Sequence, residues 1–192
     1  YAQSLSLEKT WGGTSTEYGV GVAVDGSGNI YVAGQTWSFG AGNADVVLLK
    51  YDPSGGLVWQ KTWGGDYDDY GYGVAVDGSG NNVYVTGETN SFGAGDYDVV
   101  LLKFNSAGTL QWEKTWGGTS HDGGHDVAVD GSGNNIYVTG CTNSFGAGGF
   151  DVVLLKFDSS GGLAWQKTWG GTGGDYGYGV AVDGSGNNVY VT

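Results

Sequence analysis

The stretch Lys61-Thr62-Trp63-Gly64-Gly65 is one of four copies of the same pentapeptide in this chain. The four copies place their tryptophans at Trp11, Trp63, Trp116 and Trp169, at spacings of 52, 53 and 53 residues. Each of these tryptophans lies 14 residues before an Asp-Gly-Ser-Gly-Asn turn. Repetition with a period of about 20–50 residues is the sequence signature of solenoids, propellers and arrays. The 192 residues are therefore expected to form one tandem-repeat domain, 1–192.

Each repeat unit has the pattern of four short strands joined by tight turns. In the second unit the expected strands cover residues 73–76, 83–86, 99–104 and 110–116. Glycine, asparagine, aspartate and serine, which suit tight turns, lie between them. Four strands in about 50 residues match one blade of a propeller. The sequence predicts an all-β fold, a β-propeller of four-stranded antiparallel blades. A β-solenoid is the alternative, although its coils are usually shorter and lack such regular hairpins.

The repeat boundaries predict an incomplete ring. The units cover about residues 12–63, 64–116, 117–169 and 170–192, and the last unit is incomplete. Residues 1–11 are expected to supply the outer strand of a preceding or closing blade, over Ser6–Trp11. The total of 15 strands is about 3.5–4 blades, at or below the usual range of four to eight. An open arc would expose apolar blade faces. We therefore expect self-association, or continuation in a longer chain, to give a ring of about seven or eight blades.

The recurring residues resemble a known bacterial family. The pattern is Trp-Gly-Gly, then Tyr-Gly-x-Gly-Val-Ala-Val-Asp, Asn-x-Tyr-Val-Thr-Gly, Ser-Phe-Gly-Ala-Gly and Asp-Val-Val-Leu-Leu-Lys. It is similar to the SBBP repeat, named for a seven-bladed β-propeller, over essentially the whole chain. The resemblance implies a prokaryotic protein that is extracellular or on the cell surface. It implies no enzymatic activity and no catalytic residues.

The charge restricts the possible ligands. The net charge is −13, from 20 acidic residues and 7 lysines, with no arginine. A phosphate-binding surface needs clustered Lys and Arg, so nucleic acid is not an expected partner. No apolar run approaches the ~18 residues of a membrane-spanning helix, so membrane insertion is not expected. Cations and neutral, hydroxyl-rich ligands remain, including a glycan or a protein ligand. All lysines fall at two repeat positions: Lys9, Lys61, Lys114 and Lys167, then Lys50, Lys103 and Lys156.

Acidic residues recur at two positions of the repeat and form the main candidate ligand-binding site. Both positions lie in loops that a propeller places on the same face, and carboxylate oxygens converging there could bind Ca²⁺ or sugar hydroxyls. Alternatively, each carboxylate caps a turn or accepts backbone N–H groups. No other cofactor is expected. The loop before the first strand of each unit contributes Glu17, Asp69, Asp122 and Asp175, and the start of the third strand contributes Asp45, Asp98 and Asp151.

Two further loops are weaker candidates. His121, Asp122 and His125 occur together only in the third unit and could bind Zn²⁺ or Ni²⁺. Alternatively, His125 packs in the way expected of its counterparts Tyr72 and Tyr178. Asp66 and Asp68 lie in an acidic, aromatic loop over residues 66–70. That loop is either a site of specific recognition or a solvated surface loop.

The tryptophans of each fourth strand, such as Trp112 and Trp116, could stack on sugar rings or pack between blades. The leading interpretation is a non-catalytic extracellular binding or scaffold propeller, acting in cell-surface adhesion or carbohydrate contact. The alternative is a structural, self-assembling or engineered repeat scaffold that oligomerises through its blade faces. A carboxylate-based hydrolase is a minor alternative, because repeated carboxylates lack the unequal environments of an acid and a nucleophile. The lone Cys141 has Gln35 and Glu88 as its counterparts, so no function is expected of its thiol.

Overall fold

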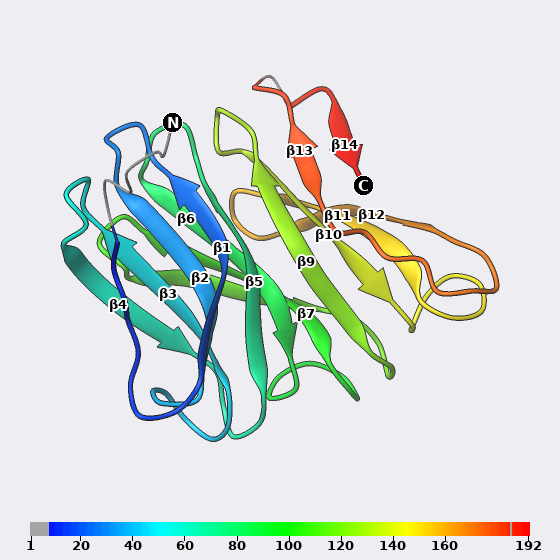
Figure 1. Ribbon diagram of the computed structural model, residues 1–192. Helices are drawn as coiled ribbons and strands as arrows, with labels where there is room; N and C mark the ends of the chain where they lie inside the picture. The colour runs from blue at the N-terminus through cyan, green and yellow to red at the C-terminus, as the bar shows by residue number, and fades with distance from the viewer. Residues whose placement is uncertain (1–7, 185) are drawn as a thin grey trace, which may run out of the picture.

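The chain is a β-propeller segment, as the sequence predicts. The computed structural model describes residues 8–184 and 186–192, which form β-strands and no helix. The strands make three four-stranded antiparallel sheets and one small two-stranded sheet (Figure 1). This part of the chain has no helix long and apolar enough to cross a membrane.

Consecutive strands pair with each other in every blade. The first blade contains β1 (Glu17–Val24), β2 (Ile30–Thr36), β3 (Asp45–Tyr51) and β4 (Leu57–Trp63). The second contains β5 (Asp69–Val76), β6 (Asn82–Thr89), β7 (Asp98–Asn105) and β8 (Leu110–Trp116). The third contains β9 (Asp122–Val129), β10 (Asn135–Thr142), β11 (Asp151–Asp158) and β12 (Leu163–Trp169). The small sheet pairs β13 (Val180–Val182) with β14 (Val189–Val191).

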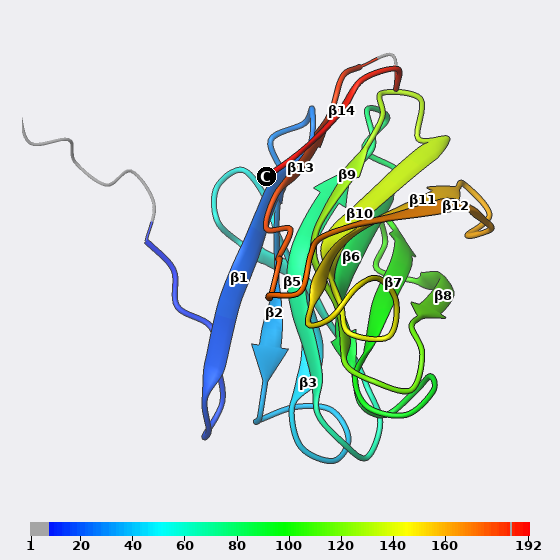
Figure 2. The ribbon, with the colours of Figure 1, turned by 90° about the vertical axis from the view of Figure 1, so that its right-hand side faces the viewer.

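The first strand of each blade is the innermost one. Strands β1, β5, β9 and β13 lie next to one another, and each complete sheet extends away from them (Figures 1 and 2). Neighbouring inner strands approach closely, because a Cβ added at Gly21 would lie 2.5 Å from the carbonyl oxygen of Tyr72. Glycine at this position therefore allows β1 and β5 to come together.

Apolar side chains fill the space between successive blades. Between the first and second blades, Leu48 of β3 and Tyr31 of β2 pack with Val85 and Leu102 of the second blade. The interface between the second and third blades repeats this cluster at the equivalent positions. The third strand of a middle blade is apolar on both faces because each face covers a neighbouring blade. Beyond the third blade, β13 and β14 pack in a smaller cluster with Tyr137 of β10 and Leu154 of β11.

The fourth-strand tryptophans pack between blades, one of the two alternatives raised by the sequence. The indole of Trp63 donates to Glu113 Oε2 at 2.7 Å, and that of Trp116 donates to Gln166 Oε1 at 2.9 Å. Trp112 donates in the same way to the carbonyl oxygen of Ser159, at 3.2 Å. These rings tie the outer edge of each blade to the next blade.

The expected outer strand over Ser6–Trp11 is not formed in the part that the structure describes. Residues 6 and 7 lie outside the described residues, and residues 8–11 form no strand. A strand needs a neighbour for its backbone hydrogen bonds, and no described strand pairs with residues 8–11. Trp11 nevertheless makes the contacts of its repeat counterparts, since its indole donates to Gln60 Oε1 at 2.9 Å and packs on Phe39.

The first two strands of each blade are longer than predicted. In the second blade, β5 begins at Asp69 and β6 ends at Thr89, which lie opposite each other in the ladder. The register shifts between Gly71 and Gly73, as in a β-bulge. The bulge lets the segment before Gly73 continue the pairing, which the glycine-rich sequence does not reveal.

Candidate functional site

The recurring carboxylates come together in pairs between blades, but they are buried. Asp45 at the start of β3 lies near Asp69 at the start of β5, on either side of Gly64. Asp98 and Asp122 flank Gly117 in the same way, while Asp151 and Asp175 flank Gly170. The predicted placement of the two loops on one face is therefore correct. The side chains of Asp45, Asp69, Asp98, Asp122 and Asp151 are almost fully inaccessible.

The hydrogen bonds of Asp69 show what the carboxylate before the first strand does. Its Oδ2 accepts the backbone N–H of Gly65 at 2.8 Å and the hydroxyl of Ser91 at 2.7 Å. Its Oδ1 accepts the hydroxyl of Thr89. Asp122 repeats these bonds in the third blade, and Glu17 accepts bonds from Gly13 and Thr36 in the first. These acids hold the loops of a blade together, as the turn-capping alternative predicts.

In two of the pairs, the partner carboxylate, Asp45 or Asp98, is less well satisfied. Burial, together with the nearby charge of Asp69, raises the pKa of Asp45 to about 6. Burial likewise raises the pKa of Asp98. Oδ2 of Asp45 and Oδ1 of Asp98 are buried without a hydrogen-bond partner in the described part of the chain.

The described residues contain no group of three His, Cys, Asp or Glu side chains placed to hold a metal ion. Each carboxylate pair supplies two acidic side chains, whereas Ca²⁺ takes six to eight oxygen ligands. Asp122 does not join His121 and His125, although the two histidines line the same hollow. Asp122 bonds inside its own blade, His121 Nε2 lies 2.9 Å from Glu88 Oε2, and His125 Nδ1 lies 2.8 Å from the carbonyl oxygen of Gly177.

In the acidic, aromatic loop before β5, some side chains are exposed and others pack against neighbouring residues. Asp66 and Tyr67 are exposed. Asp68 Oδ1 accepts the backbone N–H of Ala44 at 3.2 Å, so this carboxylate joins the first and second blades. Tyr70 stacks on Tyr97 and Tyr72, at centroid distances of 5.9 and 6.4 Å. Only Asp66 and Tyr67 are thus free to meet a partner from this loop.

A pocket of about 670 Å³ lies beside the inner strands and includes several residues that the motifs did not single out. It is lined by Val20, Tyr72, Glu88, His121, His125, Cys141, Phe150, Tyr176 and Tyr178. We call this hollow the aromatic pocket.

The aromatic pocket is lined only by positions at which the repeats differ. Its nine lining residues come from five repeat positions, and every one of these positions changes between copies. Val20, Tyr72, His125 and Tyr178 occupy one position, whereas Glu88 and Cys141 share another with Gln35. His121 and Phe150 differ from all their counterparts, whereas the position of Tyr176 is tyrosine in three copies and changes only at Gly123. Residues that build the blades recur in every copy, so this variation is not required by the fold.

Aromatic rings form a closed circuit around the pocket. Each ring lies next to two others, with centroids 5.1–6.4 Å apart, within the usual range for aromatic pairs. His125 stacks on Tyr178 and meets Tyr72 edge-on, so it packs with its tyrosine counterparts as predicted. The circuit runs through Tyr70, Tyr97, His121, Phe150, Tyr176, Tyr178, His125 and Tyr72.

Glu88 is the acidic group of the aromatic pocket. Its side chain is largely buried, and Tyr72 donates its hydroxyl to Oε1 at 2.8 Å. Its Oε2 lies 2.9 Å from His121 Nε2. The hydrogen bond with Glu88 raises the pKa of His121, and burial with the charge of Glu88 raises the pKa of Tyr72. The pocket therefore holds one buried carboxylate among rings, with no lysine in its lining.

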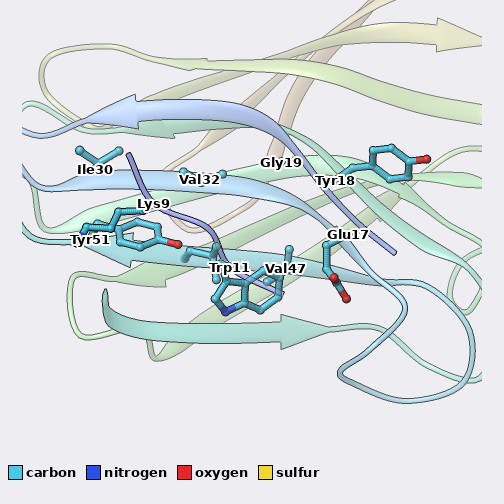
Figure 3. Close-up of a pocket in the computed structure, with 10 residues that line it drawn as sticks. Lys9, Trp11, Glu17, Tyr18, Gly19, Ile30, Val32, Val47 and Tyr51 are labelled. Carbon is cyan, nitrogen blue, oxygen red and sulfur yellow. The ribbon is translucent and has the colours of Figure 1, made fainter. Parts of the chain in front are cut away.

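A second hollow of about 350 Å³ has a different origin. It lies on the outer face of the first blade, where Lys9 and Trp11 cross over Val32, Val47 and Tyr51 (Figure 3). The counterparts of these three residues in the second blade are Val85, Val100 and Phe104, which are buried against the first blade. This hollow is therefore an uncovered blade-packing surface, and its lining gives no indication of a ligand.

The repeats match a known family model. The beta-propeller repeat named SBBP matches residues 12–40, 61–93 and 116–146. The chain carries SBBP repeats. A curated relative, the regulatory protein FlaEY of Caulobacter vibrioides, is 29% identical over 163 residues. That match covers 74% of this chain and 16% of the relative, so the chain spans a small part of that protein.

One solved structure is similar to this chain at the level of the fold. A crystal structure of a protein of unknown function from Bacteroides caccae has a TM-score of 0.52 at 13% identity. The match covers 90% of this chain and 52% of that chain. A structure described as the eukaryotic initiation factor is similar at a TM-score of 0.42 and 8% identity, over 88% of this chain and 47% of that one. The latter similarity is too weak to support any conclusion.

Most of the candidate residues that the sequence motifs indicate lie outside the aromatic pocket, whereas His121 and His125 line it. The recurring acids lie elsewhere in the repeat, and the pocket is formed where copies disagree. Glu88, Tyr72 and Tyr178 were noticed only as counterparts of Cys141 and His125. Alignment of the repeats, followed by a search for variable columns, would have identified every lining residue.

Proposed function

We propose that this chain is part of a non-catalytic binding propeller whose ligand enters the aromatic pocket. The observation that carries the proposal is that all nine lining residues occupy repeat positions that vary, in a chain whose other blade positions largely recur. Binding sites are typically concave, with apolar and aromatic walls and a few polar groups. The aromatic pocket has this composition.

The same groups favour binding over catalysis. Cys141 Sγ lies 3.8 Å from His125 Nε2, which resembles the spacing of a thiol and its base. However, burial raises the pKa of Cys141 to about 11, so the thiol stays protonated and unreactive near neutral pH. Glu88 and His121 are bonded to each other, and the paired carboxylates are buried away from the pocket. We therefore assign no reaction to this site.

We further propose that the propeller acts outside the cell or at its surface, in adhesion or ligand capture. The support is the resemblance to SBBP repeats and the acidic, arginine-free composition, which suits neither nucleic acid nor an anionic membrane. Carbohydrate contact through the fourth-strand tryptophans loses its basis, because Trp63, Trp112 and Trp116 bond to the next blade. The exposed rings of Tyr176 and Tyr178 in the pocket offer a surface for a ligand instead.

The binding proposal can be tested by screening the 192-residue chain against a glycan array and a panel of small amines. Ligands that enter the pocket should be lost in Tyr178→Val, which introduces the residue found at the equivalent Val20. They should be retained in Tyr67→Ser, which removes an exposed ring outside the pocket and introduces the residue of Ser15 and Ser120. A screen without hits, or hits that survive Tyr178→Val, would contradict the proposal.

A scaffold role is the second candidate, and a separate observation favours it. The outer face of the first blade leaves Val22 and Val24 more than half exposed. Exposed apolar patches on soluble proteins commonly mark interaction sites. In this alternative the blade faces mediate self-assembly, and the solution mass of the chain tests it.

A further inference from the structure

We infer that the aromatic pocket binds an organic cation, in particular an alkylated ammonium group. This inference deepens the proposed binding function and rests on it. It is drawn from three features of the pocket: the circuit of rings around it, the buried carboxylate of Glu88, and the absence of any lysine in its lining.

The rings provide the first reason. The face of an aromatic ring carries negative charge density, and a cation within about 6 Å of a ring centroid is attracted to it. Quaternary ammonium groups are the ligands typically held by cages of several rings. Tyr72 of the second repeat unit and Tyr176 and Tyr178 of the fourth all line the same hollow. Phe150 adds a further ring, and its centroid lies 5.3 Å from that of Tyr176.

The buried carboxylate provides the second reason. Glu88 lies among rings, and each of its carboxylate oxygens has one hydrogen-bond partner. Oε1 accepts the hydroxyl of Tyr72, and Oε2 is bonded to Nε2 of His121. A carboxylate in apolar surroundings is costly unless a positive charge compensates it. His121 can compensate it only in its protonated form. An ammonium group in the pocket would supply the same charge without depending on the histidine.

The absence of competing positive charge provides the third reason. All seven lysines lie at two repeat positions on the fourth and third strands or their equivalents, and none lines the pocket. With a net charge of −13, the chain attracts cations and repels anions over a long range. An anionic ligand would find no lysine or arginine here.

A neutral sugar fits the same pocket less well. Its hydroxyl groups would need hydrogen-bond partners, because burying unpaired hydroxyls costs free energy. Four polar side chains of the lining are already engaged: Glu88 bonds to Tyr72 and His121, and His125 bonds to the carbonyl oxygen of Gly177. A trimethylammonium group needs no such partners, since it has no N–H to donate.

The test compares choline with its uncharged tert-butyl isostere, which has the same shape without the charge. Binding to the 192-residue chain is followed by isothermal titration and by the quenching of tyrosine and tryptophan fluorescence. Two pocket variants have counterparts elsewhere in the chain: Glu88→Gln introduces the residue of Gln35, and Tyr178→Val introduces that of Val20. Tyr67→Ser is the control outside the pocket.

We expect choline to bind about tenfold more tightly than its isostere, and each pocket variant to weaken it by a similar factor. Tyr67→Ser should bind it as the unmodified chain does. Equal binding of the two probes, or no binding of choline, would overturn the cation assignment. If choline fails while a glycan binds and is lost in Tyr178→Val, the pocket remains a binding site for a neutral ligand. If no ligand of either class binds, the proposed binding function fails as well.

Discussion

At the scale of single residues, the first glycine of each Trp-Gly-Gly is required by the carboxylates around it. A Cβ added at Gly117 would lie 1.8 Å from Asp98 Oδ1 and 2.7 Å from Asp122 Oδ2. We predict that Gly117→Ala lowers the free energy of unfolding by about 2–4 kcal/mol, because a buried pair must move. Gly171→Ala, where no atom lies within 4 Å of the added Cβ, should have a much smaller effect. Urea unfolding of both variants checks this, and equal effects would contradict it.

The buried carboxylates also predict an unusual pH dependence. The pKa of Asp45 is about 6 in the folded chain, against an ordinary value of 3.8. The folded state therefore holds its proton more tightly than the unfolded state does, so stability decreases as pH rises from about 4 to about 6. We predict that Asp45→Asn reduces this decrease, because an amide does not ionise.

The control for this pH dependence is Asp52→Asn. Hydrogen bonds from Ser54 and Gly56 lower the pKa of Asp52, so its contribution is present above pH 3.8 and is lost only as pH falls below that value. The slope between about pH 4 and about pH 6 should therefore remain as in the unmodified chain. Chemical unfolding at several pH values measures each slope. An unchanged slope in Asp45→Asn would show that Asp45 is not the titrating group.

At the scale of elements, the position of a blade in the array decides how much a strand is buried. Val138 of β10 and Val32 of β2 occupy the same repeat position. Val138 is fully buried because the second blade covers it, whereas Val32 lies partly open on the outer face of the first blade. We predict that Val138→Ala costs about 2 kcal/mol of stability and Val32→Ala clearly less. Thermal unfolding of the two variants compares one substitution in two environments, and equal losses would contradict the blade order.

Elements that depend on local pattern were predicted well from the sequence, and those that depend on a partner were not. The fourth strand of the second blade was predicted at 110–116 and is β8 (Leu110–Trp116). The strand expected over Ser6–Trp11 has the same residue pattern, yet residues 8–11 form no strand because no neighbouring strand pairs with them. Sequence periodicity reports which face of a strand is apolar, and it cannot report whether a neighbour is present.

At the scale of the whole molecule, the repeat predicted the architecture but concealed the candidate site. The sequence indicates recurring residues such as Asp69 and Asp122 as candidate ligand-binding groups. In the structure their carboxylates are buried and accept hydrogen bonds that connect loops of one blade. Glu88 and Tyr178 belong to no motif, and only the folding of successive blades around one line brings them to the same hollow. Their convergence is a property of three-dimensional packing. What the sequence does carry is the variation of these positions from copy to copy.

The open face of the first blade leads to a prediction about the whole chain in solution. Val22 and Val24 are 67% and 61% exposed on a face that is apolar in every blade. The equivalent face of the second blade is covered by the first, so the same chemistry on the first blade should bind a second copy of the chain. We expect the 192-residue chain to associate as its concentration rises, with a weight-average mass above 19.8 kDa in sedimentation equilibrium.

Val22→Lys combined with Val24→Lys should restore the monomer mass, because burying two ammonium groups at an apolar contact is unfavourable. Tyr67→Lys, a charge added at an exposed residue of the second blade's loop, should leave association unchanged. A chain that stays monomeric at all concentrations would show that this face does not recruit a second copy.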